Sequence, residues 1–118
     1  MQESGEMYLE TILTLSENNS YVRSIDVADA MSFSKPSVSR AMSKLKADNY
    51  ISIDKNGFIT LTDSGRAIAE KIYERHTVIS KLLMSIGVDE ETATADACRI
   101  EHVISDKTFA AVKKAIKK

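Results

Sequence analysis

A strong turn signal lies directly after two short segments with helical periodicity. An Asp-Lys-Asn-Gly sequence at 54–57 separates two short segments rich in β-branched residues, as in a β-hairpin. A two-residue loop would place Ile53 opposite Thr60. A three-residue loop instead pairs Ile53 with Ile59, keeps the apolar side chains on one face and gives Gly57 a left-handed backbone. We therefore predict a hairpin with the three-residue loop.

Two short helices are predicted immediately before this hairpin. The first covers residues 25–31, and the hydroxyl of Ser24 is its expected N-cap. The second is opened by the sequence Ser-Lys-Pro at 34–36 and ends near Asp48. Proline is tolerated there because the first turn of a helix has no internal hydrogen bond for it to break. Two short helices joined by a tight turn and followed by a hairpin form a winged helix-turn-helix.

Helical periodicity also predicts one helix before this unit and three helices after it. The first covers residues 3–17, and the longest runs from about residue 63 to Met84. The apolar stripe expected along the longest helix consists of Ile72, His76, Ile79, Leu83 and Ile86. The caps and stops expected after the hairpin are Thr62 or Asp63, Gly87, Asp89, and Ser105 or Asp106. We therefore predict a mainly α-helical fold with a small β-hairpin, with a winged-helix domain over 1–62 and a helical domain over 63–118.

Composition excludes several classes of protein. The chain has 118 residues, of which 43% are hydrophobic and 28% are charged. This composition is typical of a folded globular protein rather than a disordered one. Its net charge of −1 argues against sequence-blind coating of nucleic acid. The single cysteine, Cys98, excludes an intrachain disulfide, and neither a signal peptide nor a membrane-spanning run is visible. We expect a cytoplasmic protein with no membrane partner.

The clearest electrostatic signal is a basic segment. Residues 31–47 contain four basic residues and no acidic one. A charged run is usually only a solvated helix face, but this one coincides with the second helix of the predicted helix-turn-helix, which enters the major groove in DNA-binding proteins. Within it, Pro36 suits a thymine methyl and Arg40 suits the hydrogen-bonding edge of guanine. The side chains expected to contact the DNA backbone are Arg23, Ser34, Lys35, Ser37, Ser39, Lys44 and, at the tip of the hairpin, Lys55.

A second candidate site lies near the carboxyl end of the chain. Cys98, Glu101 and His102 are spaced i, i+3 and i+4, so in a helix a thiol, a carboxylate and an imidazole share one face. These three groups can bind one metal ion. Taken singly, each also has a structural explanation, because a free cysteine is most often a small buried apolar residue and the other two are ordinary on a helix face.

Three further donors occur on other predicted helices. Met7 and Glu10 are spaced i, i+3 on the first helix, and His76 lies on the longest one. Taken singly, Met7 is explained as an apolar residue that packs in the core, and His76 as a buried histidine with hydrogen-bond partners. However, the chain has only two histidines and one cysteine, and all of them fit one cluster if the first helix packs between the other two. We therefore predict metal ligands among Met7, Glu10, His76, Cys98, Glu101 and His102.

These residues carry a resemblance to a known family. The whole chain resembles the diphtheria-toxin-repressor family of bacterial metal-dependent transcriptional repressors, including its manganese-transport regulator branch. The segments that carry the resemblance lie at 6–12, 34–39, 61–66, 75–76 and, most specifically, 97–106. The resemblance implies a winged-helix DNA-binding domain, a helical dimerisation domain, a divalent metal as corepressor, and the short form that has no SH3-like domain.

The resemblance is mixed between the two branches of the family. The iron-sensing branch is matched at Met7, Cys98, Glu101 and His102. The manganese branch shares Glu10, His76, Glu101 and His102. Of the ancillary site of the iron branch only His76 is matched, because Ser80 and Thr94 stand where that site has a carboxylate and an imidazole. Since thiolate and thioether suit Fe(II) better than Mn(II), we favour Fe(II) and keep Mn(II) as the alternative.

The predicted protein is a homodimeric repressor that binds Fe(II) or Mn(II) and then a palindromic double-stranded operator of metal-homeostasis genes. Two other functions are considered. One is a winged-helix regulator that responds to an organic effector, which would need an apolar pocket instead of a ligand cluster. The other is a small non-haem metalloenzyme, but no phosphate-binding glycine loop, nucleophile elbow or catalytic acid pair is visible. We therefore do not expect an enzyme.

Overall fold

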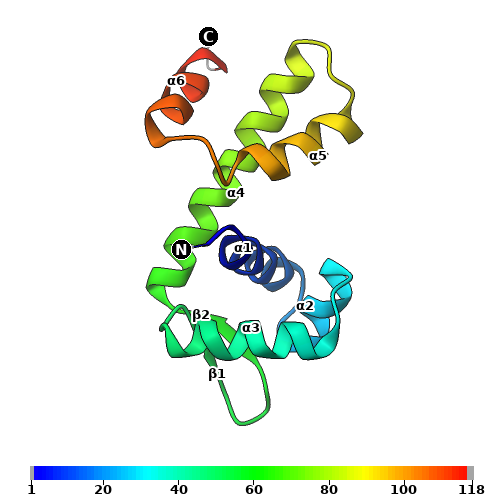
Figure 1. Ribbon diagram of the computed structural model, residues 1–118, viewed down its shortest axis with the longest axis vertical. Coiled ribbons are helices and arrows are strands. Elements are labelled where there is room, and N and C mark those ends of the chain that lie inside the picture. Colours follow the sequence, from blue (N-terminus) through cyan, green and yellow to red (C-terminus); the bar gives the residue numbers. More distant parts are fainter. Residues whose placement is uncertain (1, 117–118) are drawn as a thin grey trace. The chain divides into compact units, whose positions relative to one another are not determined.

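The computed structural model describes residues 2–116 and divides the chain into two compact units, Met1–Glu70 and Lys71–Lys118 (Figure 1). The elements in chain order are α1 (Glu3–Asn18), α2 (Ser24–Met31), α3 (Lys35–Ala47), β1 (Ile51–Ile53), β2 (Ile59–Leu61), α4 (Asp63–Ser85), α5 (Glu90–Ile100) and α6 (Asp106–Ile116). The predicted mainly helical fold with one hairpin is confirmed. The first unit contains the winged helix-turn-helix, and the second contains most of α4 together with α5 and α6.

Helix α3 forms where the sequence predicts it, for local reasons. The hydroxyl of Ser34 accepts a hydrogen bond from the backbone N–H of Ser37 at 3.3 Å, and Pro36 occupies the first turn. Val38, Met42 and Leu45 are spaced four and three residues apart and are buried in the core of the first unit. The opposite face of α3 is therefore turned to solvent.

The hairpin has the predicted register. Strands β1 and β2 are antiparallel and pair Ile51 with Leu61 and Ile53 with Ile59. Gly57 has φ 81°, in the left-handed region that glycine adopts without strain. The backbone N–H of Ile59 also donates to the carbonyl of Val22 at 2.7 Å, which joins the chain before α2 to the hairpin.

The predicted cap of α2 is wrong. Ser24 is already the first helical residue, and Arg23 occupies the N-cap position. The backbone N–H of Arg23 donates to a carboxylate oxygen of Asp26 at 2.8 Å. The start of the helix is therefore capped by an acid within its first turn and not by the hydroxyl of Ser24.

The second unit has its own small core of Ile79, Ala97 and Phe109. Asp89 caps α5 by accepting from the N–H of Thr92 at 2.9 Å, as predicted. The apolar stripe of α4 is shorter than predicted, because Ile86 lies beyond the end of the helix and is 69% exposed. No helix within residues 2–116 is long and apolar enough to cross a membrane.

Candidate functional site

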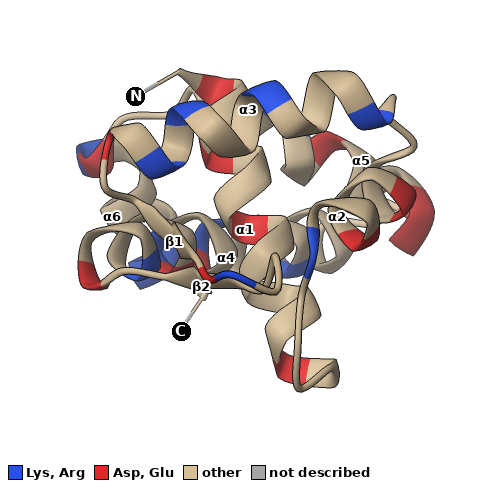
Figure 2. Cartoon of the chain, turned by 90° about the horizontal axis from the view of Figure 1, so that it is seen from below, with Lys and Arg blue, Asp and Glu red and all other residues tan. Residues whose placement is uncertain are grey.

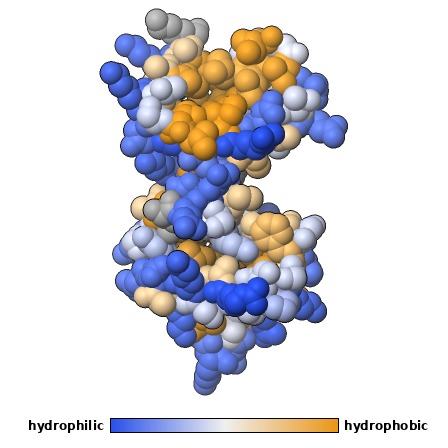
Figure 3. Space-filling model, in the orientation of Figure 1, coloured by the Kyte–Doolittle hydropathy of each residue, from blue (hydrophilic) through white to orange (hydrophobic). Residues whose placement is uncertain are grey.

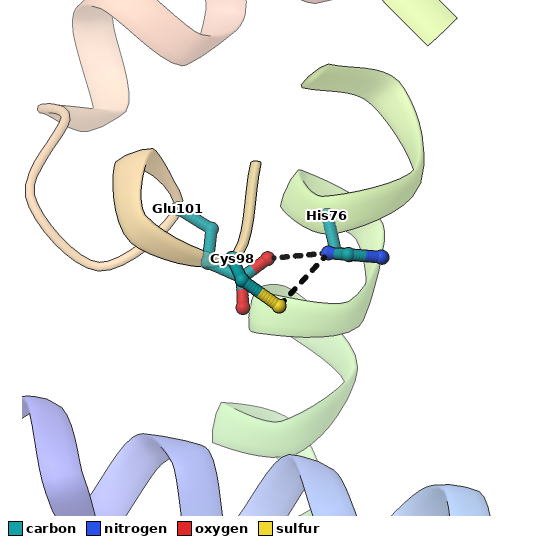
Figure 4. Close-up of side chains that lie close together, drawn as sticks. All are labelled: His76, Cys98 and Glu101. Carbon is teal, nitrogen blue, oxygen red and sulfur yellow. Dashed lines mark hydrogen bonds and ion pairs between the residues drawn. The ribbon is translucent and has the colours of Figure 1, made fainter. Parts of the chain in front are cut away.

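Three of the predicted metal ligands converge in the second unit. His76 extends from α4, Cys98 from α5, and Glu101 from the residue that follows α5 (Figure 4). Nδ1 of His76 lies 3.0 Å from Oε2 of Glu101 and 3.8 Å from Sγ of Cys98. One potential ligand atom from each residue lies within 4.8 Å of the other two. The three side chains are therefore close enough to bind one ion together.

The helix that carries Cys98 ends earlier than the spacing argument assumed. Helix α5 stops at Ile100, and residues 101–104 form a turn, so Glu101 and His102 do not lie inside a helix with Cys98. Glu101 still has helical dihedral angles, φ −58° and ψ −25°, and its N–H donates to the carbonyl of Ala97 at 3.0 Å. Glu101 therefore lies close to Cys98, as predicted, although the helix ends before Glu101.

His102 lies on the other side of the Glu101 carboxylate. Its Nε2 is 3.4 Å from Oε1 of Glu101, and both side chains are only 1% exposed. The carboxylate therefore lies between two imidazoles, with Oε2 toward His76 and Oε1 toward His102. A buried carboxylate is costly unless charged or hydrogen-bonding groups face it, and the hydrogen bond between His76 and Oε2 meets part of that need.

The remaining two predicted ligands, Met7 and Glu10, belong to the first unit. They lie one turn apart on α1, and both are partly buried. The structure thus brings His76, Cys98 and Glu101 together within the second unit and places His102 beside Glu101. The participation of Met7 and Glu10 stays a prediction.

The donor types in the second unit fit a divalent transition metal. Thiolate, imidazole and carboxylate are the three protein groups that bind such ions most often. One imidazole nitrogen lies close to both a carboxylate oxygen and a sulfur, which is compatible with a shared ion. A thiolate in the set favours the softer ions of the series over magnesium or calcium.

The candidate nucleic-acid interface lies in the first unit, on the exposed side of α3. Figure 2 shows the basic residues of this helix along a segment without acids. The predicted contacts are exposed, except that Ser37 is partly buried; they are Arg23, Ser34, Lys35, Pro36, Ser37, Ser39, Arg40, Lys44 and Lys55. Ser34 and Ser37 bond to each other at 2.8 Å, and Arg40 donates to Ser37 at 3.4 Å. The hydroxyls therefore help to orient Arg40.

An aromatic stack beside the hairpin was not anticipated. The rings of Tyr21 and Phe58 are stacked with centroids 4.4 Å apart, and the guanidinium of Arg23 lies 4.6 Å above the Phe58 ring. Tyr21 is 66% exposed. No local pattern links residues that are 35 or more positions apart, and the hydrogen bond between Val22 and Ile59 helps to bring these segments together. Arg23 is thereby held beside the wing.

Two family models together match both units of the chain. Residues 1–57 match the iron dependent repressor N-terminal DNA binding domain, and residues 62–118 match the iron dependent repressor metal binding and dimerisation domain. The HTH-type transcriptional regulator MntR of Lysinibacillus sphaericus (strain C3-41) is 36% identical over 102 residues, which cover 86% of this chain and 73% of that protein. The chain belongs to the iron-dependent repressor family. The predicted resemblance is thereby confirmed.

Other members of the iron-dependent repressor family are similar over most of this chain. An uncharacterized HTH-type transcriptional regulator of Methanocaldococcus jannaschii is 34% identical over 115 residues, covering 96% of this chain and 92% of that protein. A manganese-dependent transcriptional repressor, solved in complex with manganese, superposes with a TM-score of 0.88 at 26% identity over 96% of this chain. The chain spans about half the length of this repressor and of the solved manganese regulator SloR. These relatives are named as transcriptional regulators, which agrees with the expectation that the chain is not an enzyme.

Proposed function

We propose that this chain is a DNA-binding transcriptional repressor whose affinity for its operator depends on a bound divalent metal. The observation that carries the proposal is the convergence of His76, Cys98 and Glu101 in a chain whose other unit is a winged helix-turn-helix. In this proposal residues 1–62 form the DNA-binding domain and residues 63–118 the metal-binding and dimerisation domain. The geometry of the second unit supports ligation by His76, Cys98, Glu101 and His102.

Helix α3 would read DNA in the major groove. Its buried stripe fixes it on the core, and its exposed face carries Lys35, Arg40 and Lys44 without an opposing acid on the same helix. In this geometry Arg40 suits a base edge, while Lys35 and Lys44 suit phosphates. Arg23, held above Phe58, and Lys55 would add backbone contacts beside the wing.

The second unit has the apolar surface that a dimer requires. Figure 3 shows apolar side chains gathered on this unit. The large apolar side chains of the unit that are at least 40% exposed are Tyr73, Met84, Ile86 and Val103. Apolar groups gathered at a surface commonly mark a protein interface. A twofold dimer would present two copies of α3 to two half-sites, which is why the proposed operator is palindromic.

Metal would act by connecting the ligands of the second unit to α1. When bound, a divalent ion supplies positive charge that holds carboxylate, thiolate and imidazole donors together. Glu10 and Met7 on α1 are the proposed partners from the first unit. Helix α1 packs on α2, and α2 packs on α3, so a restraint on α1 also restrains the reading helix. A few kcal/mol of differential affinity suffice for such a shift in population.

Fe(II) is the proposed physiological metal, and Mn(II) is the alternative. Cys98 and Met7 offer sulfur, which favours iron over manganese. Glu10 and His76 add harder donors, and the solved relative that contains manganese supports the alternative.

The test is to select tight-binding duplexes from a random pool with the metal-loaded chain and then titrate them at one fixed salt concentration. We expect a palindromic sequence to be enriched, and its binding to require Fe(II) under anaerobic conditions or Mn(II), with Zn(II) as a comparison. Chelator should remove the binding. Enrichment and affinity that are the same in the presence of chelator would contradict the proposal.

A further inference from the structure

Arg75, the residue before His76 on α4, has a buried charged side chain and is not one of the proposed metal ligands. It is only 5% exposed. Its Nη1 donates to the backbone carbonyls of Glu101 at 3.1 Å and Ile104 at 2.8 Å. Its Nη2 is paired with the carboxylate of Asp106. One guanidinium thus binds both ends of the turn at 101–104 and the first residue of α6.

These contacts replace hydrogen bonds that the backbone cannot make by itself. The carbonyls of Glu101 and Ile104 lie beyond the end of α5 at Ile100, and a buried carbonyl without a donor is costly. The turn that ends α5 meets this need with donors from α4. A guanidinium is suited to it because its donors lie in one plane at fixed angles.

The direction of the guanidinium is itself fixed from two sides. The Asp106 carboxylate also accepts from Nζ of Lys71 at 2.9 Å, so it is held by two cations on successive turns of α4. On the other side, the Phe109 ring centroid lies 5.4 Å from Cζ of Arg75. Arg75 therefore has little freedom to move without breaking several contacts.

The turn that Arg75 holds carries two of the proposed ligands. We infer that Arg75 is a positioning residue of the metal centre, one that sets the position of Glu101 and His102 relative to His76. This inference rests on the proposed function. Because Arg75 and His76 are neighbours on one rigid helix, any shift of the turn on Arg75 also changes the separation of the Glu101 carboxylate from the His76 imidazole. Groups that orient metal ligands typically change metal affinity by about 10- to 100-fold when they are replaced.

Replacing a residue that only joins two helices should not change metal affinity, and the chain contains such a residue for comparison. Lys113 on α6 pairs with Glu74 on α4 at 2.9 Å, which also ties a later helix to α4 next to Arg75. This pair joins α6 directly to α4 rather than through the turn at 101–104. Lys113→Gln is therefore the matched control for Arg75→Lys, which keeps the charge but replaces the planar fork.

The experiment titrates the full chain with Co²⁺ alone, without oxygen, and records affinity and the visible absorption at saturation, which reports ligand number and geometry. Thermal unfolding without metal is measured in parallel. We expect Arg75→Lys to bind Co²⁺ about tenfold more weakly or worse, with a changed spectrum at saturation. Lys113→Gln should bind within about twofold of the parent chain and keep its spectrum, whatever its loss of thermal stability.

A folded Arg75→Lys chain with the parent affinity and spectrum would overturn the inference. If Arg75→Lys does not fold, Asp106→Asn tests the inference in its place. This substitution removes the anion that directs the guanidinium and leaves the contacts with the two backbone carbonyls. We expect weaker Co²⁺ binding and a changed spectrum there as well, and parental values would overturn the inference. Absence of any Cys98-dependent Co²⁺ absorption in the parent chain would instead refute the proposed metal site itself.

Discussion

The thiol of Cys98 lies on an exposed position of α5, 3.8 Å from Nδ1 of His76. An exposed side chain contributes little to the core, so its removal separates ligand chemistry from folding. We expect Cys98→Ala to keep a folded dimer and to lose metal-dependent DNA binding, measured by fluorescence anisotropy of a labelled operator with and without metal. Thr94→Ala is the matched control, because Thr94 is exposed one turn earlier on the same helix. Equal metal dependence in the Cys98→Ala and Thr94→Ala chains would show that the thiol is not a ligand.

Gly65 occupies a position where no other residue fits. A Cβ added there would lie 2.0 Å from the carbonyl oxygen of Tyr50, a backbone atom that cannot turn away. We expect Gly65→Ala to lower the free energy of unfolding by about 1–3 kcal/mol through overpacking, measured by urea denaturation. The neighbouring substitution Arg66→Ala removes an exposed ion pair with Glu70 and should change the free energy of unfolding by less than about 1 kcal/mol. A Gly65→Ala chain as stable as the parent would mean that α4 does not start this close to Tyr50.

Helix α3 offers two kinds of contact that one pair of substitutions can separate. Lys44→Ala should weaken binding to all DNA sequences alike and reduce the slope of log affinity against log salt by about 1, because it removes one phosphate contact. Arg40→Ala should instead relax preference at one base pair, at a cost of about 1–3 kcal/mol. The measurement is binding to the operator and to single-base variants over a range of salt concentrations.

Lys114, which is exposed on α6, provides the control for this pair of variants. Its replacement by alanine should leave both the salt slope and the base preference unchanged. If Arg40→Ala lowers affinity for every base variant equally, Arg40 contacts the backbone rather than a base.

The start of α6 gives the second unit a defined dependence on pH. A hydrogen bond from Lys71, the charge of Lys71 and the charge of Arg75 hold the pKa of Asp106 below its ordinary value of 3.8. A lowered pKa in the folded state stabilises the fold at pH values above 3.8, and this contribution disappears as the pH falls through the folded-state pKa. We therefore expect Asp106→Asn to be less stable than the parent at pH 5 to 7, with the difference in thermal unfolding temperature shrinking below about pH 4. A difference that stays constant down to pH 3 would contradict this role of the ionised carboxylate.

Apart from the cap of α2, the elements with local signals were predicted correctly from sequence, whereas the end of α5, which is fixed at long range, was not. The register of the hairpin follows from the loop at 55–57, and the caps Ser34 and Asp89 bond to residues three positions later. By contrast, the end of α5 involves hydrogen bonds from Arg75, 26 or more positions away, so the spacing of Cys98 could not reveal it.

The same distinction applies to the candidate site. The proximity of Cys98 to Glu101 follows from backbone that stays helical up to Glu101, whereas the approach of His76 depends on how α4 packs in the second unit. The sequence suggested His76 because histidine is rare in this chain and because the resemblance includes the segment at 75–76. That all six predicted residues act as ligands, and that the domains divide after residue 62, stay predictions.

Charge is distributed very unevenly along the whole molecule. Residues 1–20 contain four acids and no base, residues 31–47 contain four bases and no acid, and residues 107–118 contain five lysines, although the net charge is only −1. A near-neutral total therefore does not argue against DNA binding once the basic residues gather on one helix. Acids on α1 and in the second unit oppose that binding, and a bound divalent cation would offset part of their charge.

The proposed function requires metal and DNA to bind cooperatively, so the coupling between the two ligands is its sharpest test. The measurement is the affinity of the chain for its selected operator at fixed salt with saturating Fe(II) or Mn(II) and with chelator, together with metal affinity with and without that operator. Linkage requires the two ratios to be equal. We predict that metal tightens DNA binding by about tenfold or more and that DNA tightens metal binding by the same factor. A ratio of one in both directions would rule out metal-dependent DNA binding by this chain.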